Sequence, residues 1–197
     1  DFGTTELAIL RRLCREGPND VFLCGDIAQH VLPKHRSLRE ARIDLTARRR
    51  ITRNYRNSRE ILRAAYEILF ANLDEDMLES ADLEILDPEL ANRSSNQPLV
   101  LAADTLESEL GYARTLAEDH LAARPGDRCC IAFAGYTIRE VDQLARALQL
   151  PALHGELRPI QEPLVLSDLE QTKGYEFNLM IIVNCNHGVL PPWGAPE

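Results

Sequence analysis

The sequence has no run of about 20 apolar residues, the length that a helix needs to cross a membrane. It also has no basic segment followed by an apolar stretch of the kind that forms a secretory signal peptide. From these two absences we predict a protein without a membrane partner, and we expect it in the cytoplasm.

Paired cysteines and clustered metal ligands are also missing. The five cysteines are odd in number and none has C-x-x-C spacing, and most fall in predicted strands, so we expect buried thiols in a reducing compartment. The five histidines are scattered, and Cys185 with His187 is too sparse a set for zinc. We therefore predict no metal site.

The charge is unevenly distributed. A formal net charge of −9 argues against nucleic acid wrapped over the whole surface. Half of the 22 Lys and Arg residues nevertheless lie within one short segment, which comprises Lys34, Arg36, Arg39, Arg42, Arg48, Arg49, Arg50, Arg53, Arg56, Arg59 and Arg63. This basic segment could contact phosphates. It could equally be a solvated face whose charges are partly paired within the chain, and the sequence leaves both interpretations open.

Apolar patterns of strand and helix length alternate along the chain and predict an α/β fold, with a parallel sheet covered by helices on both faces. The expected strands are residues 20–24, 48–53, 99–102, 129–133, 151–153, 165–166 and 180–183. The expected helices are residues 6–15, 37–43, 60–70, 106–123 and 138–148. An acidic and then polar stretch predicts a linker at residues 76–98 between domains at 1–75 and 99–197.

Three short blocks combine turn residues with chemistry. Residues 21–29 form an apolar run that ends in Gly25-Asp26-x-x-Gln29, which places Gln29 just past the carboxyl end of a strand. Residues 51–58 place Tyr55 beside Arg56, an aromatic face that can stack on a base and a guanidinium that can reach a phosphate. Residues 172–177 contain Lys173-Gly174, a tight turn that lets the backbone approach a ligand, and the carboxylate of Glu176.

In this order the three blocks resemble motifs III, IV and V of the UvrD/Rep-type superfamily I DNA helicases. The resemblance implies RecA-like domains, ATP and Mg²⁺ as cofactors, and single-stranded or partly duplex DNA as partner, with protein partners in DNA repair or recombination. It implies that Gln29 and Arg56 read the γ-phosphate and that Tyr55 stacks on adenine. Gly174 and Glu176 would contact the nucleotide, and Arg36 and Lys173 would contact DNA.

Two departures from the family pattern concern DNA contact. The aromatic group that usually follows Gln29 is missing, and Asp168 and Glu170 stand where the family typically has Thr and His. Two carboxylates would repel DNA phosphates, whereas the nucleotide half of the third block is intact. This favours an alternative, a degenerate helicase-like module that binds nucleotide or protein without translocating.

The G-x-x-x-x-G-K-[ST] phosphate loop, a Walker B pair of carboxylates and motif VI are all missing from the 197 residues. Asp1 could be the last residue of an acidic motif II, and we expect the Mg²⁺ ligands to lie outside this sequence. The resemblance thus implies an inactive carboxyl-proximal fragment of an ATP-dependent DNA helicase whose complete polypeptide translocates on single-stranded DNA and unwinds duplex. A nuclease-associated helicase subunit is a further alternative.

Overall fold

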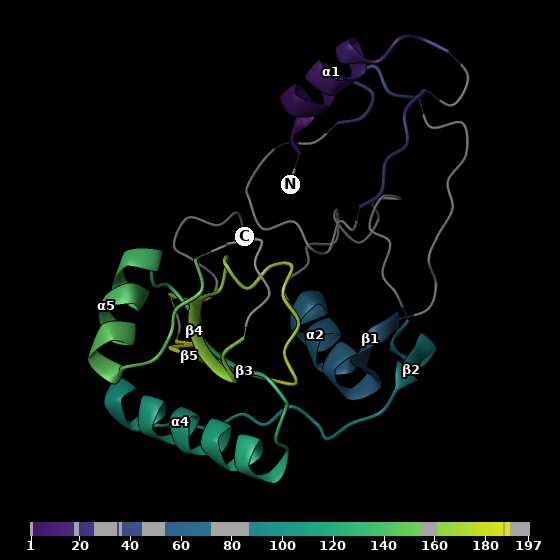
Figure 1. The fold of residues 1–197 in the computed structure, drawn as a ribbon. Helices are drawn as coiled ribbons and strands as arrows, with labels where there is room; N and C mark the ends of the chain where they lie inside the picture. Colours follow the sequence, from purple (N-terminus) through teal and green to yellow (C-terminus); the bar gives the residue numbers. More distant parts are fainter. Residues whose placement is uncertain are drawn as a thin grey trace. The chain divides into compact units, whose positions relative to one another are not determined.

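The computed structural model describes residues 2–17, 20–25, 35, 37–44, 54–71, 87–154, 161–186 and 188–189. The chain divides into two compact units, Asp1–Leu99 and Val100–Pro196. The first unit contains α1 (Thr4–Leu13), β1 (Asn54–Ser58), α2 (Arg59–Ala71), the 3₁₀ helix η2 (Pro88–Leu90) and β2 (Ala91–Arg93). The second contains α4 (Leu106–Ala123), β3 (Cys129–Phe133), α5 (Ile138–Leu148), β4 (Leu164–Asp168) and β5 (Leu179–Val183) (Figure 1).

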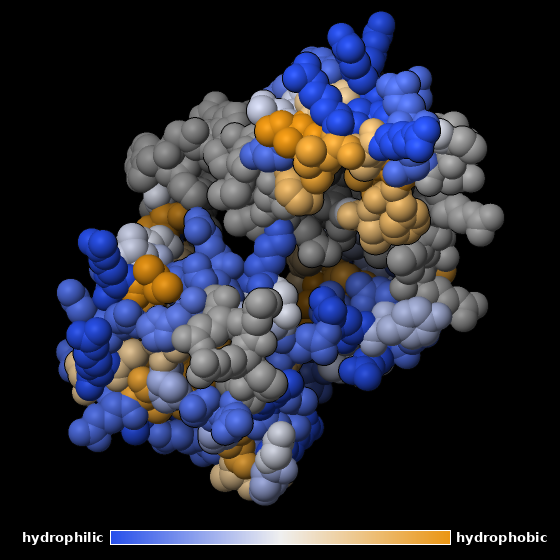
Figure 2. Space-filling model, turned by 45° about the horizontal axis from the view of Figure 1, so that its top comes forward, coloured by the Kyte–Doolittle hydropathy of each residue, from blue (hydrophilic) through white to orange (hydrophobic). Residues whose placement is uncertain are grey.

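Helix α1 buries little of its predicted apolar face. Leu7 packs in a small cluster with Ala41 and Ile43. Leu13 is 77% exposed, and Ile9 and Leu10 are also exposed. Figure 2 shows apolar side chains at the surface in the upper part of the view, which contains α1. The helix was predicted, with the apolar residues Leu7, Ile9, Leu10 and Leu13 on one face. That face is not buried as a whole, because of these four residues only Leu7 packs in the cluster.

Two predicted elements near α1 are wrong. Residues 20–24 form no strand, and Phe22 is 90% exposed, so this apolar run is not a core strand. Residues 37–43 form a turn instead of a helix, because Ile43 N donates back to Leu38 O (2.9 Å) and Arg42 has a positive φ of 57°. The strand predicted at residues 48–53 lies outside the described residues.

Strand β1 passes directly into α2. Ser58 ends the strand, and its Oγ accepts a hydrogen bond from Ile61 N (3.3 Å), which makes Ser58 the N-cap of α2. The helix predicted at residues 60–70 is confirmed as α2, which is one residue longer at each end. Strand β1 pairs in parallel with β2, which lies within the segment that the sequence assigned to a linker.

The second unit is built on a parallel sheet with strand order β4-β3-β5. At the short strand predicted for residues 151–153 the structure has only an isolated parallel bridge, between Ala152 and Leu166 of β4. The predictions for residues 106–123, 129–133 and 138–148 agree with α4, β3 and α5 at both ends. The coarse α/β fold class is therefore correct.

The central strand β3 is completely buried, and its two faces meet different neighbours. Cys129, Ile131 and Phe133 pack in one cluster with residues of α4 and α5. Cys130 and Ala132 pack in a second cluster, together with loop residues that include Tyr175 and Phe177. Among the described residues of this unit, helices therefore cover one face of the sheet and a loop covers the other, which corrects the prediction of helices on both faces.

The predicted strand at residues 99–102 is also wrong. These residues form no strand, and Leu99, Val100 and Leu101 are 71%, 92% and 56% exposed. A strand needs a hydrogen-bonded neighbour, and local apolar composition cannot supply one. This segment is therefore an exposed apolar connection to α4.

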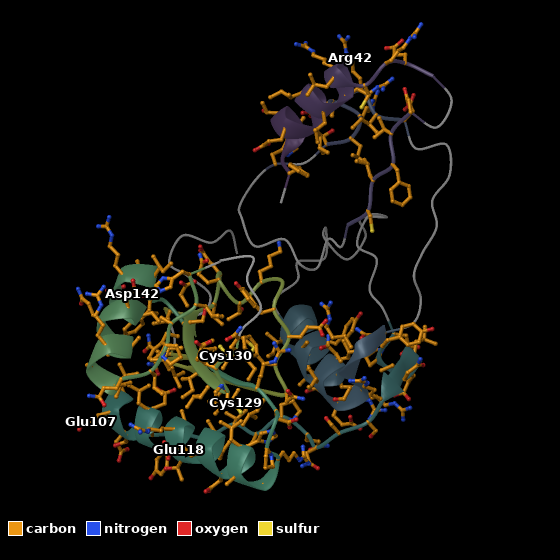
Figure 3. The ribbon with its side chains drawn as sticks, viewed as in Figure 1. Arg42, Glu107, Glu118, Cys129, Cys130 and Asp142 are labelled. Atoms are coloured by element: carbon orange, nitrogen blue, oxygen red, sulfur yellow. The ribbon has the colours of Figure 1, made fainter. Side chains whose placement is uncertain are left out.

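The predicted burial of the cysteine thiols is only partly correct. All five cysteines are free. Cys129 and Cys130 are buried in β3, as predicted (Figure 3). Cys24 and Cys185 are exposed instead. Burial raises the pKa of Cys130 to about 12. Within the described ranges, no helix has the length and apolar character required to cross a membrane.

Candidate functional site

The first candidate surface is the pair Tyr55 and Arg56 on β1. Asn54 Oδ1 accepts hydrogen bonds from both Arg56 N and Asn57 N, each at 2.9 Å, which fixes the backbone around the pair. Tyr55 is 61% exposed and Arg56 is also exposed. Tyr55 and Arg56 are thus both exposed on a strand that leads into a capped helix, and Asn54 fixes the backbone around them.

A polar cluster braces the end of this strand. Glu60, in the first turn of α2, accepts hydrogen bonds from Ser94 Oγ (2.6 Å) and Ser95 N (2.8 Å). Ser95 Oγ donates in turn to Ser58 Oγ (2.7 Å). The Ser94 hydroxyl, and next the Ser95 amide, lower the pKa of Glu60 to about 2. This Glu60 clamp ties the chain after β2 to the start of α2.

Part of the basic segment is paired within the chain. Arg59 Nε lies 3.5 Å from Glu89 Oε2. Arg63 forms a hydrogen-bonded ion pair with the same carboxylate, which raises the pKa of Arg63. For these two arginines the interpretation as a solvated, internally paired face is favoured. The residues numbered 34, 36, 48–50 and 53 lie outside the described residues.

The second candidate surface is the turn that follows β4. Asp168 ends the strand at 5% exposure, and its Oδ1 accepts a hydrogen bond from Gln171 N (2.9 Å). Thr172 Oγ1 donates to Leu169 O (2.6 Å), and Lys173 N donates to Glu170 O (3.2 Å). From the sequence, the carboxylates of both Asp168 and Glu170 were expected to face DNA. In the structure only Glu170 is exposed.

An aromatic pair anchors the far end of this turn. Gly174 has a φ of 93°, a left-handed conformation that side chains rarely adopt, so the predicted tight turn is present. Tyr175 and Phe177 stack with their ring centroids 6.4 Å apart and pack on the second face of the sheet. Lys173 and Gly174 are left exposed in the turn that follows the carboxyl end of β4, the edge of a parallel sheet at which open α/β folds bind ligands. Glu176 is also exposed, between the two packed rings in the segment that leads to β5.

Sequence reasoning missed a further polar group at this edge. Asn184 follows β5 in a left-handed conformation with a φ of 63°. Its backbone N donates to Glu109 Oε1 (2.9 Å), and its Nδ2 donates to Ala134 O (2.8 Å). Asn184 therefore joins the ends of β3 and β5 to the first turn of α4. An asparagine directly after an apolar strand was the available signal.

The predicted site residues fall into two groups. Tyr55 and Arg56 share β1 in the first unit, whereas Lys173, Gly174 and Glu176 share the loop between β4 and β5 in the second. Gln29 and Arg36 lie outside the described residues. In the described part of the chain, no group of three His, Cys, Asp or Glu side chains could hold a metal ion.

Comparison with known proteins finds no matching family, no matching curated protein and no matching solved structure.

Proposed function

We propose that this chain supplies motifs III, IV and V of an ATP-dependent DNA helicase of the UvrD/Rep type, with RecA-like domains. The observation that carries the proposal is the exposed Tyr55 and Arg56 pair, whose backbone is fixed by Asn54 and by the capped start of α2. A base-stacking group and a phosphate-binding group need this combination of exposure and rigidity.

In this proposal Tyr55 stacks on adenine and Arg56 binds the γ-phosphate through a charge-assisted, forked contact. Gln29 senses the same phosphate. Gly174 and Glu176 contact the nucleotide from the turn after β4, and Lys173 and Arg36 bind the DNA backbone. Binding of ATP would shift the population toward a closed arrangement and hydrolysis would release it, which moves the protein along single-stranded DNA.

The 197 residues contain no phosphate loop, and the described residues offer no ligand set for Mg²⁺. We propose that the phosphate cradle and the Mg²⁺ ligands come from other parts of the complete polypeptide, and that the isolated 197 residues do not hydrolyse ATP.

The proposal is tested by the steady-state ATPase activity of the complete polypeptide, with and without single-stranded DNA. Arg56→Ala should lower kcat by at least about a hundredfold, as removal of a charge-stabilising group in an active site typically does. Tyr55→Ala should raise KM for ATP, and Tyr55→Phe should restore it because the stacking face is kept. Arg93→Ala, which removes an exposed arginine from the neighbouring strand β2, serves as the matched control.

Unchanged kinetics in both Arg56→Ala and Tyr55→Ala would reject these assignments. Turnover that ignores DNA would instead favour the second candidate, a nucleotide-binding or protein-interaction module that does not translocate. The exposed Glu170 supports this candidate, because it replaces a typical DNA-contacting residue with a carboxylate that repels phosphates.

A further inference from the structure

The neighbouring carboxylates Asp168 and Glu170 have opposite environments. Asp168 is 5% exposed and lies opposite Phe133 in the register of β4 with β3, whereas Glu170 is exposed. A buried carboxylate is costly unless polar groups compensate it. Here Gln171 N donates to Asp168 Oδ1 (2.9 Å), so the carboxylate faces its own chain.

This bond begins a turn that is held at several points. Thr172 donates to Leu169 O, Lys173 N to Glu170 O, and Tyr175 N to Thr172 O (3.1 Å). The stacked rings of Tyr175 and Phe177 fix its other end on the sheet. The exposed part between these anchors is Lys173-Gly174.

We propose that Asp168 is a positioning residue that sets the turn presenting Lys173 and Gly174, and that its charge does not face the ligand. This inference rests on the proposed function, in which Lys173 binds the DNA backbone. A threonine at this position could also accept a hydrogen bond from the amide three residues later. The replacement of the family's threonine by Asp168 therefore keeps the acceptor, and only Glu170 changes the charge presented to DNA.

Substitutions at Asp168 can separate two effects, loss of the hydrogen-bond acceptor for Gln171 N and loss of the negative charge. Asp168→Ala removes both, whereas Asp168→Asn and Asp168→Thr keep an oxygen that can accept from Gln171 N. Glu170→Gln removes a charge at the neighbouring exposed position and is the matched control.

The experiment measures binding of a fluorescent oligo-dT strand to the complete polypeptide by anisotropy, at several salt concentrations. Asp168→Ala should weaken binding about tenfold, the effect of losing one hydrogen bond to a charged group. Asp168→Thr and Asp168→Asn should recover most of the affinity. Glu170→Gln should tighten binding, most strongly at low salt, because it removes repulsion from phosphates.

Two results would overturn the inference. One is wild-type affinity in Asp168→Ala. The other is an Asp168→Asn variant that tightens binding as Glu170→Gln does, since the Asp168 charge would then face DNA. Asp168→Asn and Asp168→Thr keep the test decisive if Asp168→Ala fails to fold.

A second readout separates failure of the inference from failure of the proposed function. Hydrogen exchange of the peptide that covers residues 169–175 needs no ligand. If wild type binds no oligo-dT, the DNA-binding proposal fails. Protection that is lost in Asp168→Ala and regained in Asp168→Thr would still support the positioning role, and protection unchanged in Asp168→Ala would reject it.

Discussion

Two buried serines, Ser58 and Ser167, differ in whether their hydroxyl groups form hydrogen bonds. Ser58 is 5% exposed, caps α2 by accepting from Ile61 N, and also accepts from Ser95 Oγ. Ser167 is completely buried in β4, and its Oγ has no hydrogen-bond partner among the described residues. A buried hydroxyl without a partner keeps the cost of its lost hydration.

The same substitution should therefore have opposite effects at these two positions. Ser167→Ala should raise the free energy of unfolding by about 1 kcal/mol, because it removes a desolvated group and fills nearly the same volume. Ser58→Ala should lower it by about 1 kcal/mol through loss of the cap. Urea unfolding of the 197-residue chain measures both. Equal destabilisation by the two variants would mean that Ser167 does have a partner.

At the scale of single elements, the accuracy of prediction follows how local the signal is. Residues 106–123 and 138–148 were predicted to the residue from their apolar patterns, and in the structure each helix begins after a threonine that caps it, Thr105 and Thr137, which is a local signal too. Residues 20–24 and 99–102 were just as apolar, but a strand exists only where another strand pairs with it. Pairing is set by the tertiary fold, which a local pattern does not contain.

The candidate site follows the same rule. The capped β1–α2 junction and the turn at Gly174 were predictable, because N-cap and left-handed glycine signals are local. The direction of the Asp168 carboxylate was not predictable from the sequence. An aspartate at the end of a strand can face solvent or its own backbone, and only the packing of β4 against β3 decides between them.

Helix α5 offers a direct test of a local signal. Thr137 N donates to Glu140 Oε2 (2.8 Å) while Glu140 N donates to Thr137 Oγ1 (3.5 Å), a capping box. Thr137→Ala should lower the free energy of unfolding by about 1 kcal/mol. The Thr137 amide, and then its hydroxyl, lower the pKa of Glu140. The variant keeps the amide and loses the hydroxyl, so it should raise that pKa only part of the way toward its ordinary value. Urea unfolding and an NMR titration measure the two effects.

The control for this prediction is Thr115→Ala within α4. Thr115 Oγ1 donates to Gly111 O (3.0 Å) on an exposed face, a bond that contributes little to a helix. Alanine has the higher helix propensity, so this variant should keep or slightly raise stability. Destabilisation of similar size by both variants would show that the capping box is not the cause.

At the scale of the whole molecule, the free energy of unfolding depends on pH because several carboxylates have a lowered pKa in the folded chain. The chain carries 31 Asp and Glu against 22 Lys and Arg. The pKa values of Asp20, Glu60 and Glu140 are lowered by hydrogen bonds that exist only in the folded chain, from Gly17, Ser94 and Thr137 respectively. Each of these carboxylates therefore binds its proton more weakly when folded, and each contributes stability that is complete above its unfolded pKa and is lost as the pH falls.

Glu60 is the residue at which this linkage is best measured. Its pKa falls from 4.5 to about 2, so its contribution should be complete above pH 4.5 and should disappear as the pH drops toward 2. Glu60→Gln should be less stable than wild type at pH 7 and should converge with it near pH 2, because protonated Glu60 has lost the same charge. Hydrogen-exchange protection of residues 54–71, measured along an acid titration, follows the change. Glu67→Gln, an exposed position on the same helix, should keep the wild-type dependence. If Glu60→Gln and Glu67→Gln gave the same curve, the Glu60 clamp would not tie the chain after β2 to the start of α2 in solution, and the rigid presentation of Tyr55 and Arg56 would lose its support.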